Sequence, residues 1–310
     1  MNYQLSFPIA TVRWDGQTIS ALPESEIQQQ LDILEKAGIR EVMLAGYHEE
    51  ESATFQMEHE SRKVGDFLRT RGMKGAQHHG VAPAFTSPGT SQAEVIRRLK
   101  RCIDYTANLN ADVLVLHTGK PLGFNPVPEL VAAFEREAFR HGLETVMNTV
   151  ADNLREAGEY AAACGIRIAI ENIDGQEPLG DIEHLPVLLR QVDHPNVGFC
   201  LDTGHAWCNG TPIDNWLREL GDKLYTTHIH DNHGIPTISG ERGDEHLPPG
   251  FGTISWRDVI AGLRDAGFQN TLNFESGPWP LENPLEGYLC AIHYWQLCEQ
   301  QADRLGSYRV

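Results

Sequence analysis

The sequence predicts an α/β fold, a single (β/α)8 TIM barrel that spans residues 1–310. Apolar strand-like runs alternate with amphipathic helical segments along the whole chain, and the pattern gives eight of each. A length of 310 residues suits one barrel of eight β/α units. No linker rich in Pro or Ser, low-complexity tract or internal repeat divides the chain. An open, doubly wound parallel sheet is the structural alternative.

Short apolar runs bounded by turn residues identify the strands. The expected strands are residues 3–10, 40–45, 73–81, 112–117, 166–171, 197–202, 224–230 and 271–275. Apolar residues at helical spacing predict helices at 24–37, 53–71, 90–109, 129–164, 182–191, 212–220, 256–267 and 284–303. Start and stop signals support these bounds: Pro23 and Glu24 open the first helix, Gly38 closes it, and Ser255 precedes the seventh.

Composition and charge limit the classes of partner. Hydrophobic residues make up 41% of the chain and charged residues 22%, which is ordinary for a soluble globular protein. A net charge of −18 argues against nucleic acid, because surfaces that bind phosphate backbones are normally basic. The six cysteines form no CxxC pair, and neither a membrane helix nor a signal peptide is readable. We therefore expect a cytoplasmic protein with a small-molecule substrate and neither a nucleic-acid nor a membrane partner.

Five short apolar runs in the predicted strands each end on a residue whose side chain binds metal ions: His117, Glu171, Asp202, His228 and Glu275. In a barrel, the C-terminal ends of the strands meet at one rim, where active sites lie. Alternation along RIAIE places the isoleucines on one face and Glu171 on the other, and VGFCLD and TLNFE share this register. The five residues are therefore predicted to converge on a divalent metal ion and its substrate.

The residue types at these strand ends suit a hard or borderline cation. Two carboxylates, Glu171 and Glu275, with at least one imidazole suit Mn²⁺, Mg²⁺, Co²⁺ or Zn²⁺. Two buried carboxylates are unfavourable unless a cation neutralises them, although each glutamate alone could instead pair with an arginine. Asp202 and His205 can share one ion or divide between ion and substrate. Alone, such a pair is also found as a loop-capping Asp with a solvated His, but its position at a strand end favours the functional role.

Further histidines accompany these strand ends. His230 has the same parity as His228 and is either a ligand or a hydrogen-bonded barrel histidine. The loop that follows is rich in Gly and Pro, which suits substrate binding, and its Asp244 and His246 form an Asp-x-His pair able to hold a second ion.

Two earlier strands also end in histidine. His117, together with His78 or His79, can supply extra ligands, substrate contacts or polar plugs of the barrel mouth. Because adjacent strand residues face opposite ways, only one of His78 and His79 can point inward.

Together these motifs resemble the xylose-isomerase-like TIM barrels, and within them the sugar phosphate isomerase/epimerase group. The likeness is carried by Glu171 in IAIEN, Asp202 and His205 in LDTGHA, His228 in HIHDN, the segment HLPPGFGTI, and Glu275 in LNFES. It follows the strand order along essentially the whole chain. The resemblance implies that Glu171, Asp202, His228 and Glu275 bind one divalent ion. It also implies that the two glutamates act as acid and base beside a carbonyl, through a metal-stabilised enediolate.

The resemblance also suggests roles for the remaining polar residues. It implies substrate contacts for His205, His117, His246 and Arg242. It leaves four residues as possible ligands of additional ions: His78, His79, Asp244 and His230.

The expected activity is that of an isomerase or epimerase acting on a ketose or a related sugar or polyol derivative. A metal-dependent dehydratase of a keto-polyol is the alternative, because it needs the same enolate and then expels a hydroxyl. The superfamily also contains AP endonucleases with three zinc ions, and this chain offers candidates for that ligand set. The net charge of −18 argues against DNA repair. Barrels of this group often associate, so a homo-oligomer is compatible with the sequence.

Overall fold

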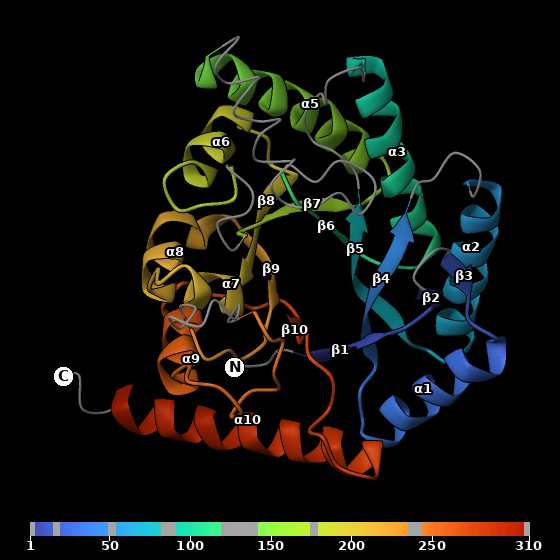
Figure 1. Cartoon of the computed structure of the whole chain (residues 1–310), viewed down its shortest axis with the longest axis vertical. Helices are drawn as coiled ribbons and strands as arrows, with labels where there is room; N and C mark the ends of the chain where they lie inside the picture. The colour runs from blue at the N-terminus through green and yellow to red at the C-terminus, as the bar shows by residue number, and fades with distance from the viewer. Residues whose placement is uncertain are drawn as a thin grey trace.

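The protein is a closed parallel barrel in its computed structural model, which describes residues 4–14, 19–48, 54–81, 91–118, 142–173, 179–234 and 244–306. Eight strands pair in the order β10-β1-β4-β5-β6-β7-β8-β9, and every one of these pairs is parallel (Figure 1). A parallel bridge between Ile229 and Phe274 closes the ring. There, Ile229 N donates to Asn273 O at 2.8 Å, and Glu275 N donates to Ile229 O at 3.0 Å. The predicted (β/α)8 barrel is confirmed.

The barrel strands and the main helices follow one another along the chain in the predicted order. The barrel strands are β1 (Leu5–Ile9), β4 (Glu41–His48), β5 (Lys74–Val81), β6 (Val113–Leu116), β7 (Arg167–Glu171), β8 (Val197–Asp202), β9 (Leu224–His228) and β10 (Leu272–Asn273). The helices are α1 (Glu24–Lys36), α2 (Thr54–Thr70), α3 (Gln92–Asn108), α5 (Leu143–Ala163), α6 (Leu185–Val192), α7 (Thr203–Cys208), α8 (Ile213–Leu220), η1 (Gly221–Lys223), α9 (Trp256–Asp265) and α10 (Pro284–Gly306).

Some elements differ from the sequence prediction. An antiparallel hairpin of β2 (Val12–Trp14) and β3 (Ile19–Ala21) was not predicted. Neither was α7, which begins directly after β8 because the Asp202 carboxylate caps it by accepting from His205 N at 2.6 Å. Of the helix expected at 129–164, the described part is α5, and residues 129–141 lie outside the described residues.

The two faces of each strand separate two apolar compartments. Ile168, Ile170 and Phe199 are fully buried in the large cluster that the outer helices cover. The opposite face contributes smaller residues, including Ala169 and Cys200, to a separate cluster inside the barrel. This is the alternation that the sequence predicts, and it turns the last residue of β7 and of β8 inward.

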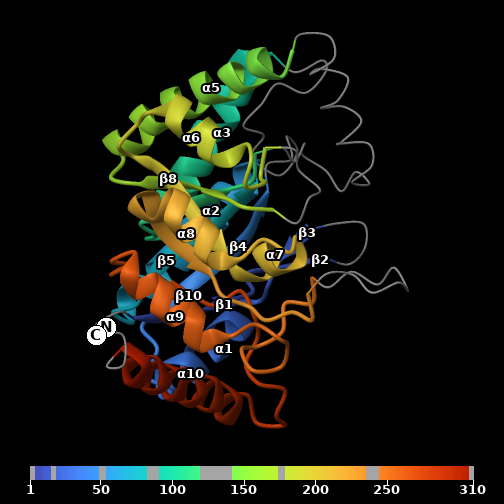
Figure 2. The same cartoon turned by 90° about the vertical axis from the view of Figure 1, so that its left-hand side faces the viewer.

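The C-terminal ends of the strands, α7 and the β2–β3 hairpin lie on one side of the barrel (Figure 2). This side carries the residues discussed below. Among the described helices, none is both long enough and apolar enough to cross a bilayer.

Candidate metal centre and active site

Four side chains converge at the C-terminal rim of the barrel. Glu171, Asp202 and His228 are the last residues of β7, β8 and β9, and Glu275 lies two residues beyond β10. Each offers one ligand atom, and these atoms all lie within 4.8 Å of one another. His228 Nδ1 is 2.9 Å from Glu171 Oε1, 3.1 Å from Glu275 Oε2 and 3.7 Å from Asp202 Oδ2. Three carboxylates and one imidazole thus surround a single point.

The chemistry of this set fits a divalent cation. His228 Nε2 is buried and has no hydrogen-bond partner within the described part of the chain. Glu171 Oε2 and Glu275 Oε2 are also buried, each with an imidazole nitrogen 3.1 Å away. Carboxylates removed from water are unfavourable without a compensating charge. A divalent ion bound by oxygen and imidazole ligands would supply that charge.

Glu171, Glu275 and His228 shift one another's pKa values. Burial raises the pKa of Glu171, but His228 and His117 outweigh burial and hold that pKa well below its usual value. Burial likewise opposes ionisation of Glu275, and His228 lowers its pKa below the usual value. Conversely, burial lowers the pKa of His228, whereas Cys200, Glu171 and Glu275 raise it well above its usual value. Glu171 and Glu275 are therefore ionised near neutral pH, as metal ligands must be.

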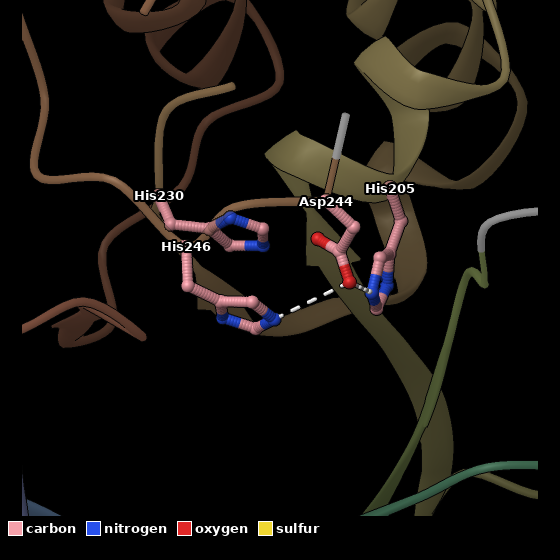
Figure 3. Close-up of side chains that lie close together, drawn as sticks. All are labelled: His205, His230, Asp244 and His246. Atoms are coloured by element: carbon pink, nitrogen blue, oxygen red, sulfur yellow. Dashed lines mark ion pairs between the residues drawn. The ribbon is translucent and has the colours of Figure 1, made fainter. Parts of the chain in front are cut away.

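A second group lies beside the first and consists of His205, His230, Asp244 and His246 (Figure 3). Asp244 Oδ2 lies between two imidazoles, 3.5 Å from His205 Nε2 and 3.4 Å from His246 Nε2. The rings of His230 and His246 stack with centroids 4.1 Å apart and 3° between their planes. Burial lowers the pKa of His246, but Asp244, Glu275 and Asp202 together outweigh burial and raise the pKa to about 9. This group also presents atoms suited to a cation.

A third group joins the other side of Glu171. His79, on β5, places Nε2 3.2 Å from Glu171 Oε2, and it belongs with Glu171 and His228 to a set able to hold an ion. His117 Nε2 lies 3.1 Å from the same carboxylate oxygen and 3.2 Å from His79 Nε2. His78 does not join them. It faces outward, with Nδ1 2.9 Å from Thr106 Oγ1 of α3, so we remove it from the candidate ligands.

Other predicted site residues contact groups at the ends of neighbouring strands. His205 Nδ1 donates to Asn172 O at 2.9 Å, so its Nε2 is the atom turned toward Asp244. His230 Nε2 lies 3.0 and 2.9 Å from the two oxygens of Asp202, so it contacts the first group while stacking in the second. Arg242 lies outside the described residues.

Sequence reasoning missed residues that orient the ligands. Asn172 Oδ1 accepts from Asp202 N at 2.8 Å, and its Nδ2 donates to Asp202 O at 2.9 Å, which ties the end of β7 to the end of β8. Its position directly after the strand-end Glu171 was the available signal. Asp231 and Asn232, which organise the loop beyond β9, carried no such signal because their partners lie 12 to 25 residues away.

Comparison with known proteins finds a matching family model and distant relatives. A family model described as "Xylose isomerase-like TIM barrel" matches residues 27–289. Inosose isomerase of Bacillus subtilis is 25% identical over 162 residues, which cover 52% of this chain and 57% of that protein. The chain spans about three fifths of the length of the first curated relatives that it matches.

Solved structures share the fold. L-ribulose 3-epimerase superposes with a TM-score of 0.68 at 15% identity, covering 93% of this chain and 94% of that one. The IolI protein with a bound zinc atom superposes with a TM-score of 0.61 at 18% identity, covering 89% of this chain and 92% of that one. At such identities, the likeness establishes the barrel architecture.

Proposed function

Because the chain belongs to the xylose isomerase-like TIM barrel family, we propose that it is a divalent-metal-dependent isomerase or epimerase of a ketose or a related sugar or polyol derivative. The observation that carries the proposal is the position of two glutamates, one at the end of β7 and one just beyond β10, around one imidazole. Glu171 and Glu275 both reach His228 Nδ1, at 2.9 and 3.1 Å. The likeness to an inosose isomerase and to the fold of a ribulose epimerase supports the reaction class.

The proposed roles follow from burial and contacts. Glu171, Asp202, His228 and Glu275 would hold the ion, which when bound would polarise substrate oxygens and acidify the carbon beside a carbonyl. One glutamate would take the proton from that carbon, and the other would return a proton to the same carbon or its neighbour. The side chain of Glu275 is 18% exposed and that of Glu171 is 0% exposed, so Glu275 is the one open to a substrate from the rim.

Substrate hydroxyls would be held by the histidines at the edge of the centre. His246, whose side chain is 39% exposed, and His205, whose side chain is 10% exposed, both border Asp244. His117 would contact substrate from the opposite side, beside Glu171. Arg242 stays a proposed substrate contact, supported only by its position in the sequence after the strand that contains His228.

A second candidate function rests on the two additional groups. His205 Nε2 and His246 Nε2 both face Asp244 Oδ2, and His79 and His117 both face Glu171 Oε2. A centre with three ions would use all of them, and such a centre suits a phosphodiesterase of the AP endonuclease type. The net charge of −18 disfavours a DNA substrate, so we rank this function second.

Metal analysis and isotope exchange test the proposal. The purified protein would be assayed for bound ions, then supplied with Mn²⁺ and a panel of free and phosphorylated ketoses in deuterated water. We expect one tightly bound ion per chain and deuterium in the product at the carbon beside the carbonyl. Loss of water from the substrate would assign the dehydratase instead. Three tightly bound zinc ions with cleavage of abasic DNA would overturn the proposal, and turnover with neither exchange nor water loss would exclude the enediolate.

A further inference from the structure

Asp231 is a buried carboxylate that the proposed chemistry does not use. The residue lies three positions beyond the end of β9 and is 0% exposed. Oδ1 accepts from Asn232 N at 3.0 Å and Ile254 N at 3.1 Å. Oδ2 accepts from Gly250 N and from Trp256 Nε1, both at 2.9 Å. Each carboxylate oxygen thus receives two N–H groups.

Most of these donors belong to residues 244–256, which we call the site loop. Asp231 also forms an antiparallel bridge with Leu247, with Asp231 N donating to Leu247 O at 2.6 Å and Leu247 N donating back at 2.9 Å. Asn232 binds the site loop near both of its ends. Its Oδ1 accepts from Glu245 N at 2.6 Å, and its backbone O accepts from Thr253 N at 2.9 Å. The two residues therefore attach the whole site loop to the barrel rim.

The site loop carries two residues of the second group. Asn232 Nδ2 reaches Asp244 Oδ1 at 3.4 Å, and His246 Nδ1 reaches the backbone O of Glu275 at 3.1 Å. His246 has a φ of 48°, a left-handed conformation that a non-glycine residue keeps only where surrounding contacts impose it. The loop passes so close that a Cβ on Gly252 would overlap Asp231 Oδ1 and lie 2.5 Å from Asn232 O.

We propose that Asp231 is a positioning residue: its carboxylate holds the site loop against the barrel and so sets Asp244 and His246 opposite His205 and Glu275. The kinetic part of this proposal rests on the proposed function, in which His246 contacts the substrate. The chemistry is specific to a carboxylate. In Asp231→Asn, either orientation of the amide would turn its NH2 group toward two N–H donors.

The test compares Asp231→Asn with Asp265→Asn, an exposed aspartate at the end of α9. Hydrogen exchange followed by mass spectrometry would report on peptides from residues 244–256. We expect exchange in these peptides to rise about tenfold or more in Asp231→Asn and to stay unchanged in Asp265→Asn. In the sugar assay, KM should rise about tenfold, with a smaller change in kcat, because a displaced substrate contact weakens binding. Mn²⁺ affinity of the four-ligand centre should stay within about twofold.

The outcomes separate the two proposals. Wild-type exchange in the site loop of Asp231→Asn would overturn the role of Asp231, as would a fall in kcat with unchanged KM. If the wild-type protein turns over no sugar, the proposed function fails, and the exchange data still decide the role of Asp231. If Asp231→Asn does not fold, Trp256→Phe removes one of the four donors and should raise site-loop exchange by a smaller factor; no increase would contradict the proposal.

Discussion

Glu275 differs from the other three candidate ligands because its side chain is partly exposed at the rim. Its side chain is 18% exposed, whereas Glu171, Asp202 and His228 are 0% exposed. Glu275→Gln keeps the shape but removes a proposed acid–base group and one charge of a proposed metal ligand. We expect turnover to fall by about a thousandfold or more, with the thermal midpoint little changed. Glu282→Gln, an exposed glutamate in the same loop, is the matched control, and wild-type turnover in Glu275→Gln would remove Glu275 from the acid–base role.

Gly204 is a second residue on which the site depends, because the site has no room for a side chain at this position. A Cβ there would overlap the His230 ring and lie 2.5 Å from Asn232 Nδ2. Gly204→Ala should therefore displace His230 from Asp202 and lower the free energy of unfolding by about 1–3 kcal/mol. Gly277→Ala, where a Cβ meets nothing within 4 Å, should be near neutral. Urea unfolding of both variants checks this, and equal stability would contradict the steric argument.

At the scale of elements, few residues pair where β9 meets β10, and side-chain hydrogen bonds reinforce this pairing. β10 spans only Leu272–Asn273, and Asn273 N donates to Thr227 Oγ1 at 3.1 Å. Thr227→Val keeps the volume but leaves that buried N–H without an acceptor, which should cost about 1–3 kcal/mol of unfolding free energy. Thr149→Val, a half-buried hydroxyl that bonds within α5, serves as control. Chemical denaturation with similar midpoints for both variants would show that closure does not need this bond.

The same scale shows which features the sequence could predict. The alternation in RIAIE predicts that Ile168 and Ile170 face the helices and Glu171 faces inward, because side-chain direction in a strand is a local property. The helix after β8 was not predicted, since it depends on the Asp202 carboxylate acting as an N-cap. The partners of Asp231 depend on the path of a loop that returns to the rim after about 20 residues, and no local pattern encodes that path.

At the scale of the molecule, the closed barrel brings residues that lie far apart in the chain to one rim and makes them share neighbours. Glu171 contacts His228 on one side and His79 on the other, and Asp202 contacts His230, which stacks on His246. The three groups are therefore not independent. A proton or cation gained by one group changes the field at the next, so the ionisation of the rim should affect the stability of the whole fold.

The raised pKa of His246 predicts how the stability of the metal-free protein changes with pH. Burial lowers its pKa, but Asp244 and Glu275 outweigh burial and raise the pKa from 6.5 to about 9. Because the folded state binds the proton more tightly, protonated His246 stabilises the fold fully below pH 6.5, and that contribution is lost as the pH rises to about 9. The side chain is 39% exposed, so after allowance for screening we expect a loss of at most about 1 kcal/mol.

Denaturant unfolding at pH 6, 7.5 and 9 with a chelator present would measure this loss. His246→Gln should reduce the pH dependence without abolishing it, because the pKa of His228 is also raised. His293→Gln, an exposed histidine of α10, should leave it unchanged. A divalent ion binds neutral imidazole, so added Zn²⁺ should stabilise the protein more at pH 7.5 than at pH 6. With chelator, stability should fall as the pH rises, whereas the stabilisation by added Zn²⁺ should grow. The two opposite pH dependences distinguish proton binding from metal binding at the same residues. If His246→Gln kept the wild-type pH dependence in the chelated protein, the stabilising proton would have to reside on another group of the rim.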